Sequence, residues 1–77
     1  MSKTEQTKHI EIIFLVEQDP EGRYTARALG ESIFTQADDM ETLRENVRDA
    51  VQCHYPHSEG RPRLIRFHEV HEEVFEV

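Results

Sequence analysis

The chain has 77 residues and a formal net charge of −7, and its hydrophobic residues, 36% of the total, gather in a few segments, which indicates a folded domain and excludes a disordered chain. One small domain of this charge disfavours nucleic acids and membrane surfaces as partners. A single cysteine excludes an internal disulfide, and no stretch has the roughly 20 apolar residues of a membrane span, so we expect a cytoplasmic protein.

The chain is expected to begin with a flexible tail and a central strand. Residues 1–8 (MSKTEQTK) lack the apolar run of a signal peptide and are interpreted as a loose tail before a single domain over residues 9–77. Residues 9–18 (HIEIIFLVEQ) are rich in β-branched side chains, which predicts a strand. Its faces would carry Ile10, Ile12, Phe14 and Val16 on one side, and Ile13 and Leu15 on the other.

Two further strands are predicted next, which gives a three-stranded meander. Asp19-Pro20-Glu21-Gly22 has the composition of a turn. Residues 23–29 (RYTARAL) then alternate, with Tyr24, Ala26 and Ala28 on one face, and the small alanines indicate that a helix packs closely there. After Gly30, the short apolar run Ser32 to Thr35 predicts the third strand.

A helix is predicted from Met40 to His54, because apolar residues recur there at a spacing of three and four. Either Asp38 or Asp39 can cap it, and Asp38 has the capping-box spacing to Glu41. Pro56 ends the helix. The apolar face consists of Met40, Leu43, Val47, Ala50 and Val51.

The last predicted element of the core fold is a strand over Arg63 to Val70 (RLIRFHEV), with Ile65 and Phe67 on one side and Leu64 and Val70 on the other. The run VFEV (residues 74–77) predicts one more short edge strand. The sequence therefore predicts an α/β (α+β) domain of order β-β-β-α-β, with one helix packed across one face of a small sheet.

This order resembles the HicB-like antitoxin family. The resemblance runs through IFLVEQ, DPEG, YTARA, SIFT, QADD and LRENVRDAV, covers about residues 10–54 and extends loosely through RLIRFHEV. It implies a partial RNase H-like fold and, as partner, a small basic RNase toxin. Members of that family often carry an appended DNA-binding segment, and residues 71–77 are too few for one, so we expect no such module.

Cys53, His54 and His57, with His68 and His71, are candidate metal ligands. A structural zinc site needs paired ligand spacings that close a tetrahedron, and one Cys-His pair beside a proline does not supply them. We therefore expect no metal and no cofactor, with Cys53 as a half-buried small hydrophobe. The alternative function is a freestanding homo-oligomeric protein that binds a metal or small ligand near Cys53, His54 and His57.

The charged residues do not predict an enzyme. Two-metal nuclease chemistry needs converging carboxylates, whereas the middle of the first strand carries none, and Glu11 and Glu17 are expected as solvent-facing charges at its ends. A set of five arginines is expected to bridge carboxylates across strands or between subunits. We do not expect these arginines to bind RNA, because interleaved aromatic residues are lacking. The set is Arg23, Arg27, Arg61, Arg63 and Arg66.

A single helix covers only one side of a four-stranded sheet, which leaves apolar side chains bare on the other side. Such a surface predicts a homodimer or a higher homo-oligomer. We expect a non-catalytic protein-binding domain that binds itself and an antitoxin-type partner. The predicted interface residues are Ile13, Leu15, Leu29, Leu64, Val74 and Phe75, with Phe67 as an alternative to Leu64.

Overall fold

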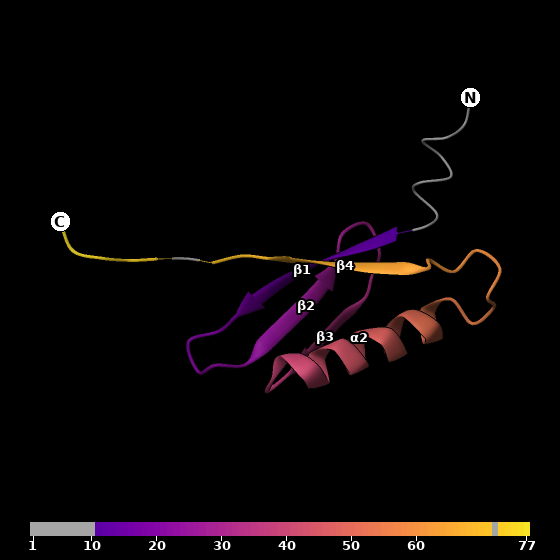
Figure 1. Cartoon of the computed structure of the whole chain (residues 1–77), viewed down its shortest axis with the longest axis horizontal. Coiled ribbons are helices and arrows are strands. Elements are labelled where there is room, and N and C mark those ends of the chain that lie inside the picture. The colour runs from indigo at the N-terminus through magenta and orange to yellow at the C-terminus, as the bar shows by residue number, and fades with distance from the viewer. Residues whose placement is uncertain (1–10, 72) are drawn as a thin grey trace, which may run out of the picture.

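The computed structural model describes residues 11–71 and 73–77. The predicted tail over residues 1–8, together with His9 and Ile10, lies outside the described residues. The predicted α/β class and the order β-β-β-α-β are confirmed (Figure 1). The elements are β1 (Glu11–Gln18), β2 (Tyr24–Ala28), β3 (Phe34–Ala37), α2 (Met40–His54) and β4 (Leu64–Glu69).

The four strands form one mixed sheet of order β3-β2-β1-β4. Strands β1, β2 and β3 pair antiparallel as a meander, whereas β4 pairs parallel with β1, from Glu11 opposite Leu64 to Val16 opposite Glu69. Parallel pairing requires a crossover, and here β2, β3 and α2 all lie between the two strands in sequence. No helix in the described part of the chain is long and apolar enough to cross a membrane.

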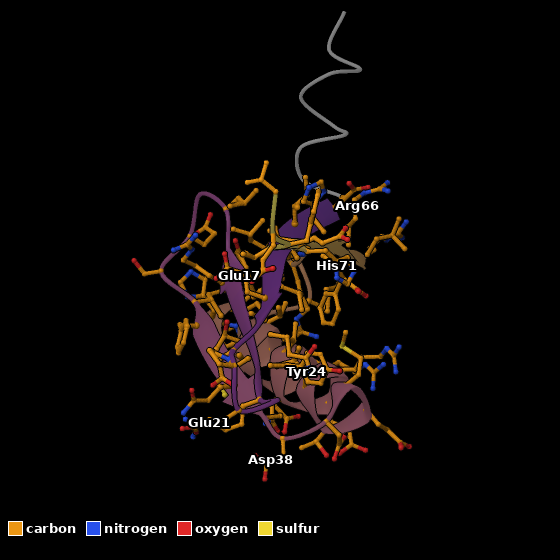
Figure 2. The ribbon with its side chains drawn as sticks, turned by 90° about the vertical axis from the view of Figure 1, so that its left-hand side faces the viewer. Glu17, Glu21, Tyr24, Asp38, Arg66 and His71 are labelled. Atoms are coloured by element: carbon orange, nitrogen blue, oxygen red, sulfur yellow. The ribbon has the colours of Figure 1, made fainter. Side chains whose placement is uncertain are left out.

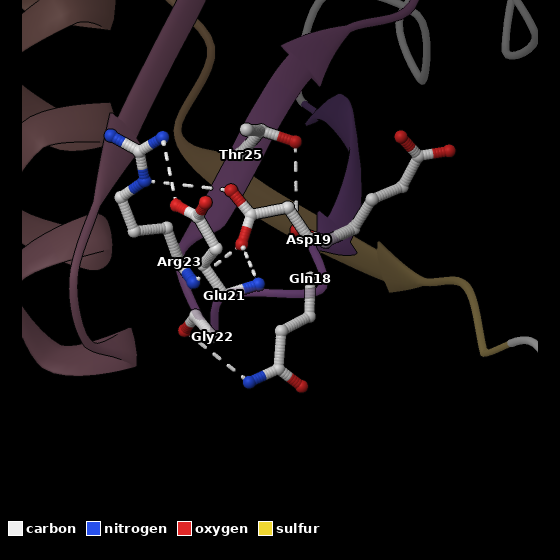
Figure 3. Close-up of polar contacts among 7 residues, drawn as sticks. Gln18, Asp19, Glu21, Gly22, Arg23 and Thr25 are labelled. Atoms are coloured by element: carbon white, nitrogen blue, oxygen red, sulfur yellow. Dashed lines mark hydrogen bonds and ion pairs between the residues drawn. The ribbon is translucent and has the colours of Figure 1, made fainter.

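The turn between β1 and β2 is held by Asp19 (Figure 3). Its Oδ1 accepts hydrogen bonds from the backbone N–H groups of Glu21 and Arg23, at 3.0 and 2.9 Å, and these donors hold the carboxyl pKa of Asp19 below its ordinary value. Gly22 has a φ of 95°, which favours glycine. The turn therefore fixes the register in which Gln18 faces Tyr24.

The core lies between the sheet and α2. Phe14 is fully buried, and its ring meets that of Phe67 edge-on with centroids 6.4 Å apart. Ala26, also fully buried, has a small side chain that leaves room for α2, as the sequence predicts. The buried cluster consists of Ile12, Phe14, Val16, Ala26, Ala28, Ile33, Leu43, Val47 and Val51.

Asp39 caps α2, so the capping box predicted from Asp38 and Glu41 is not what starts the helix. The Oδ1 atom of Asp39 accepts a hydrogen bond of 2.7 Å from the backbone N–H of Thr42, and this bond holds the pKa of the Asp39 carboxyl below its ordinary value. The helix spans the predicted residues, Met40 to His54. It lies closest to β3 and β2 (Figure 1), and the Asn46 side chain donates to the Gln36 carbonyl of β3 at 3.2 Å.

Two strand predictions are wrong. The third strand is Phe34–Ala37, two residues later than predicted, because pairing with β2 continues through Gln36 and Ala37 although they extend no apolar run. The run VFEV forms no strand, since no neighbouring strand in the described part of the chain offers it hydrogen bonds. Strands β2 and β4 are each one residue shorter at both ends than predicted.

Candidate protein-binding surface

The sheet face opposite α2 carries a group of apolar side chains, which we call the outer-face cluster. Strand alternation places Ile13 and Leu15 there, since Ile12, Phe14 and Val16 point to the core. The N–H of Leu29 donates to the Ile13 carbonyl at 2.9 Å, which sets Leu29 beside β1. The full cluster is Ile13, Leu15, Leu29, Phe34 and Leu64.

This cluster is only partly shielded from water. Leu29, Phe34 and Leu64 are 51%, 62% and 56% exposed, while Ile13 and Leu15 are half-buried by their neighbours on the sheet. Scattered apolar residues are ordinary on a protein surface, but these five occupy one face of one sheet. This grouping makes the face a candidate protein-binding surface.

Charged side chains lie among and around the cluster. Arg66 of β4 donates two hydrogen bonds to the carboxylate of Glu11 of β1, from Nε to Oε2 at 2.6 Å and from Nη2 to Oε1 at 3.1 Å. The pair lowers the pKa of the Glu11 carboxyl and raises the pKa of the Arg66 guanidinium. Arg27 lies between Leu15 and Phe34 in the strand register. The surface therefore combines apolar contact with charges of both signs, as protein interfaces do.

Two arginines of the set pair with carboxylates, and one of these pairs, that of Arg66, crosses strands as predicted. Arg66 binds Glu11, and Arg23 Nε lies 3.4 Å from Asp19 Oδ2 in the turn. Arg61 acts differently, because its guanidinium donates to the backbone carbonyls of Tyr55 and Pro56, at 2.9 and 3.2 Å, and so ties down the loop after α2.

Glu11 and Glu17 were expected to face solvent at the ends of the first strand. Glu17 is exposed, whereas Glu11 is half-buried beneath Arg66. Figure 2 looks onto the end of the molecule that holds the β1–β2 turn, where Glu21 and Asp38 point outward. This end is acidic.

Four of the six predicted interface residues come together. Ile13, Leu15, Leu29 and Leu64 belong to the outer-face cluster, while Val74 and Phe75 lie on the extended segment beyond β4 (Figure 1). Phe67, the alternative to Leu64, packs on the core side against Phe14.

Sequence reasoning missed Phe34. Its place follows from the register, which sets it opposite Arg27 on the outer face. The shifted start of β3 hid this assignment. Alternation continued from Ala28 would place Phe34 on the core face, because the alternation changes phase in the turn between β2 and β3.

The cysteine and histidine residues at the end of α2 and beyond it do not converge. Cys53 is exposed, so the expectation of a half-buried thiol is wrong, because it lies on the solvent side of the last helical turn. His54 Nε2 lies 3.2 Å from Glu31 Oε1, and its ring meets Tyr55 edge-on. Within residues 11–71 and 73–77, no group of three or more His, Cys, Asp or Glu residues is placed to hold a metal ion.

Removing metal should leave the stability unchanged. If Cys53, His54 and His57 held a structural ion, its binding free energy would be part of the folding free energy of so small a domain, and a chelator would unfold it. We expect thermal melts with and without EDTA to coincide within about 1 °C. A large fall of the melting temperature in EDTA, reversed by added zinc, would contradict this expectation.

The fold and this surface define a small α/β protein, with one helix on a four-stranded mixed sheet and an apolar outer face. Two relatives carry the name UPF0150 protein. The protein of Archaeoglobus fulgidus is 59% identical over 56 residues, which cover 73% of this chain and 82% of the relative. The protein of Thermotoga maritima is 40% identical over 55 residues, which cover 71% of this chain and 76% of the relative. The chain belongs to the UPF0150 family. No family model matches it, and no solved structure matches it.

Proposed function

We propose that this protein is a non-catalytic binding module that pairs with a second copy of itself through the outer-face cluster and takes an antitoxin-type role toward a small basic RNase. The observation that carries the proposal is the apolar outer face, with Leu29, Phe34 and Leu64 each more than half exposed. Burying a large apolar side chain contributes about 1.5–3 kcal/mol, and a domain of this size has little stability to spare.

A second copy is the simplest cover for the outer face. Two-fold pairs are the commonest assemblies, and the same cluster then lies on both sides of the interface. The charges also suit such pairing, because Arg27 and Arg66 on one copy can lie near Glu17 on the other.

The antitoxin-type role rests on charge and on the resemblance of the sequence to HicB-like proteins. With a net charge of −7 and an acidic end around Glu21 and Asp38, the molecule attracts a basic protein and speeds its association. A basic RNase presents to its substrate the kind of surface that this acidic end complements. In this proposal the protein inhibits the RNase by covering its basic surface and catalyses no reaction.

The test combines a mass measurement with co-expression. Size-exclusion chromatography with light scattering should give at least twice the 9.1 kDa of one chain at tens of micromolar. A mass of one chain would overturn the self-association. For the partner, we expect a gene for a small basic protein beside this one in the host. Its product should arrest growth when expressed alone, and co-expression of the two should restore growth and yield a complex.

The control for co-expression is an unrelated acidic protein of similar size and charge. Growth restored equally by both would overturn the antitoxin-type role, because charge alone would then explain the effect. Growth that stays arrested in the presence of this protein would overturn it as well.

A further inference from the structure

A groove runs between α2 and β4 on the helix side of the sheet. Because α2 lies over β3 and β2, it leaves β4 partly uncovered, and Ile65 and Phe67 are only half-buried. The groove has a volume of about 260 Å³. Its lining is Arg44, Val47, Arg48, Ile65, Phe67 and Glu69.

The groove lies beside an open edge of the sheet. Strand β4 pairs with β1 on one side, and none of the strands formed by the described residues pairs with its other side. A strand edge of this kind presents N–H and C=O groups that an extended segment can use. An added strand beside β4 would direct alternate side chains into the groove.

The segment of residues 73–77 has side chains that suit the groove and the open edge of β4. It runs extended away from the body of the molecule (Figure 1), with Val74 93% and Phe75 80% exposed. In an added strand Glu73, Phe75 and Val77 share one face. With this face on the groove, Glu73 complements Arg44 and Arg48, which form no ion pair with another residue in the described part of the chain. Glu69 is the one groove residue of the same sign.

The segment is poorly placed to pair with the β4 strand of its own chain. To lie beside its own β4 it would have to reverse direction over residues 70–73 (VHEE), and that stretch has none of the Gly, Asn or Asp residues that tight hairpin turns use. A second copy has no such restriction. If two copies meet at their β4 edges around a two-fold axis, each segment runs along the β4 of the other.

We infer that residues 73–77 of one copy dock as an added strand in the α2–β4 groove of a second copy. This inference rests on the proposed self-association, but it concerns a different surface from the outer-face cluster. A face-to-face pair and an exchange of segments at the β4 edge are compatible, and together they build an assembly of four chains with two kinds of interface.

The two interfaces can be separated by mass. Light scattering of the full chain at tens of micromolar should give about four times 9.1 kDa. Phe75→Ser should halve this mass, and Ile13→Ser with Leu15→Ser should also halve it, leaving pairs held by segments alone. A mass that Phe75→Ser leaves unchanged overturns the docked segment, whereas a mass that the outer-face variant leaves unchanged overturns the outer-face pairing. A wild-type monomer overturns both.

Charge reversal tests where the segment docks. Arg44→Glu with Arg48→Glu should raise the dissociation constant of the segment-mediated interface about tenfold, and adding Glu73→Arg, on the face of the segment that meets the groove, should restore much of the affinity. The matched control, Glu41→Arg with Glu45→Arg on the solvated side of α2, should not restore it. Failure of the segment reversal to restore affinity, or equal restoration by the control, overturns the assignment of the groove.

Discussion

Replacing Phe14 with alanine should destabilise the domain by about 3–5 kcal/mol, which is enough to leave much of so small a protein unfolded. Phe14 is fully buried at the centre of β1, and it packs against Phe67 of β4, so the substitution opens a cavity at the junction of two strands. The parallel pairing of β1 with β4 would lose its main side-chain contact. Urea titration followed by circular dichroism at 222 nm measures the change.

The matched control is Phe34→Ala, which removes the same atoms from the outer face. The Phe34 side chain is 62% exposed, so its loss should cost far less than the loss of Phe14. Equal shifts of the urea midpoint for the two variants would contradict the core described above.

Replacing both Ile13 and Leu15 with serine should weaken the face-to-face pair while leaving the fold intact. Each side chain contributes to the interface twice in a two-fold pair, so the dissociation constant should rise at least about tenfold for each residue replaced. The core should persist, because neither residue belongs to the buried cluster. Analytical ultracentrifugation over a dilution series measures the association, and circular dichroism checks the fold.

A control with the same number of serine substitutions is Glu45→Ser with Gln52→Ser on the exposed face of α2. These substitutions should leave the association as it is in the wild type. If the Ile13 and Leu15 variant unfolds at the same urea concentration at which it dissociates, the two residues belong to the core of the fold, and the outer face is not a separable interface.

The elements with strong periodic patterns were predictable from the sequence. Alternation along β1 identified its buried side, and the spacing from Met40 to Val51 identified the helix and its apolar face. Both elements bury one face and expose the other, and a buried face recurs along the sequence with the period of the element. The alanines of β2 also indicated the close approach of α2.

The edges of the sheet were harder to predict because their hydrogen bonds are made by backbone groups. Gln36 and Ala37 extend β3 although neither continues an apolar run, and VFEV has the composition of a strand but no neighbour within its own chain. Whether a segment forms a strand at an edge depends on its neighbour, which a local pattern does not report. The α2–β4 groove could not be predicted from a local pattern either, because it depends on where α2 crosses the sheet.

The parallel pairing of β1 with β4 has a consequence for the nascent chain. During synthesis the meander and α2 leave the ribosome before β4, because β4 follows α2 in sequence. Until residues 64–69 emerge, β1 is an outer strand of a three-stranded sheet, and the most apolar strand of the protein has an unpaired edge. Strand β4 thus turns β1 from an aggregation-prone edge into the interior of the sheet.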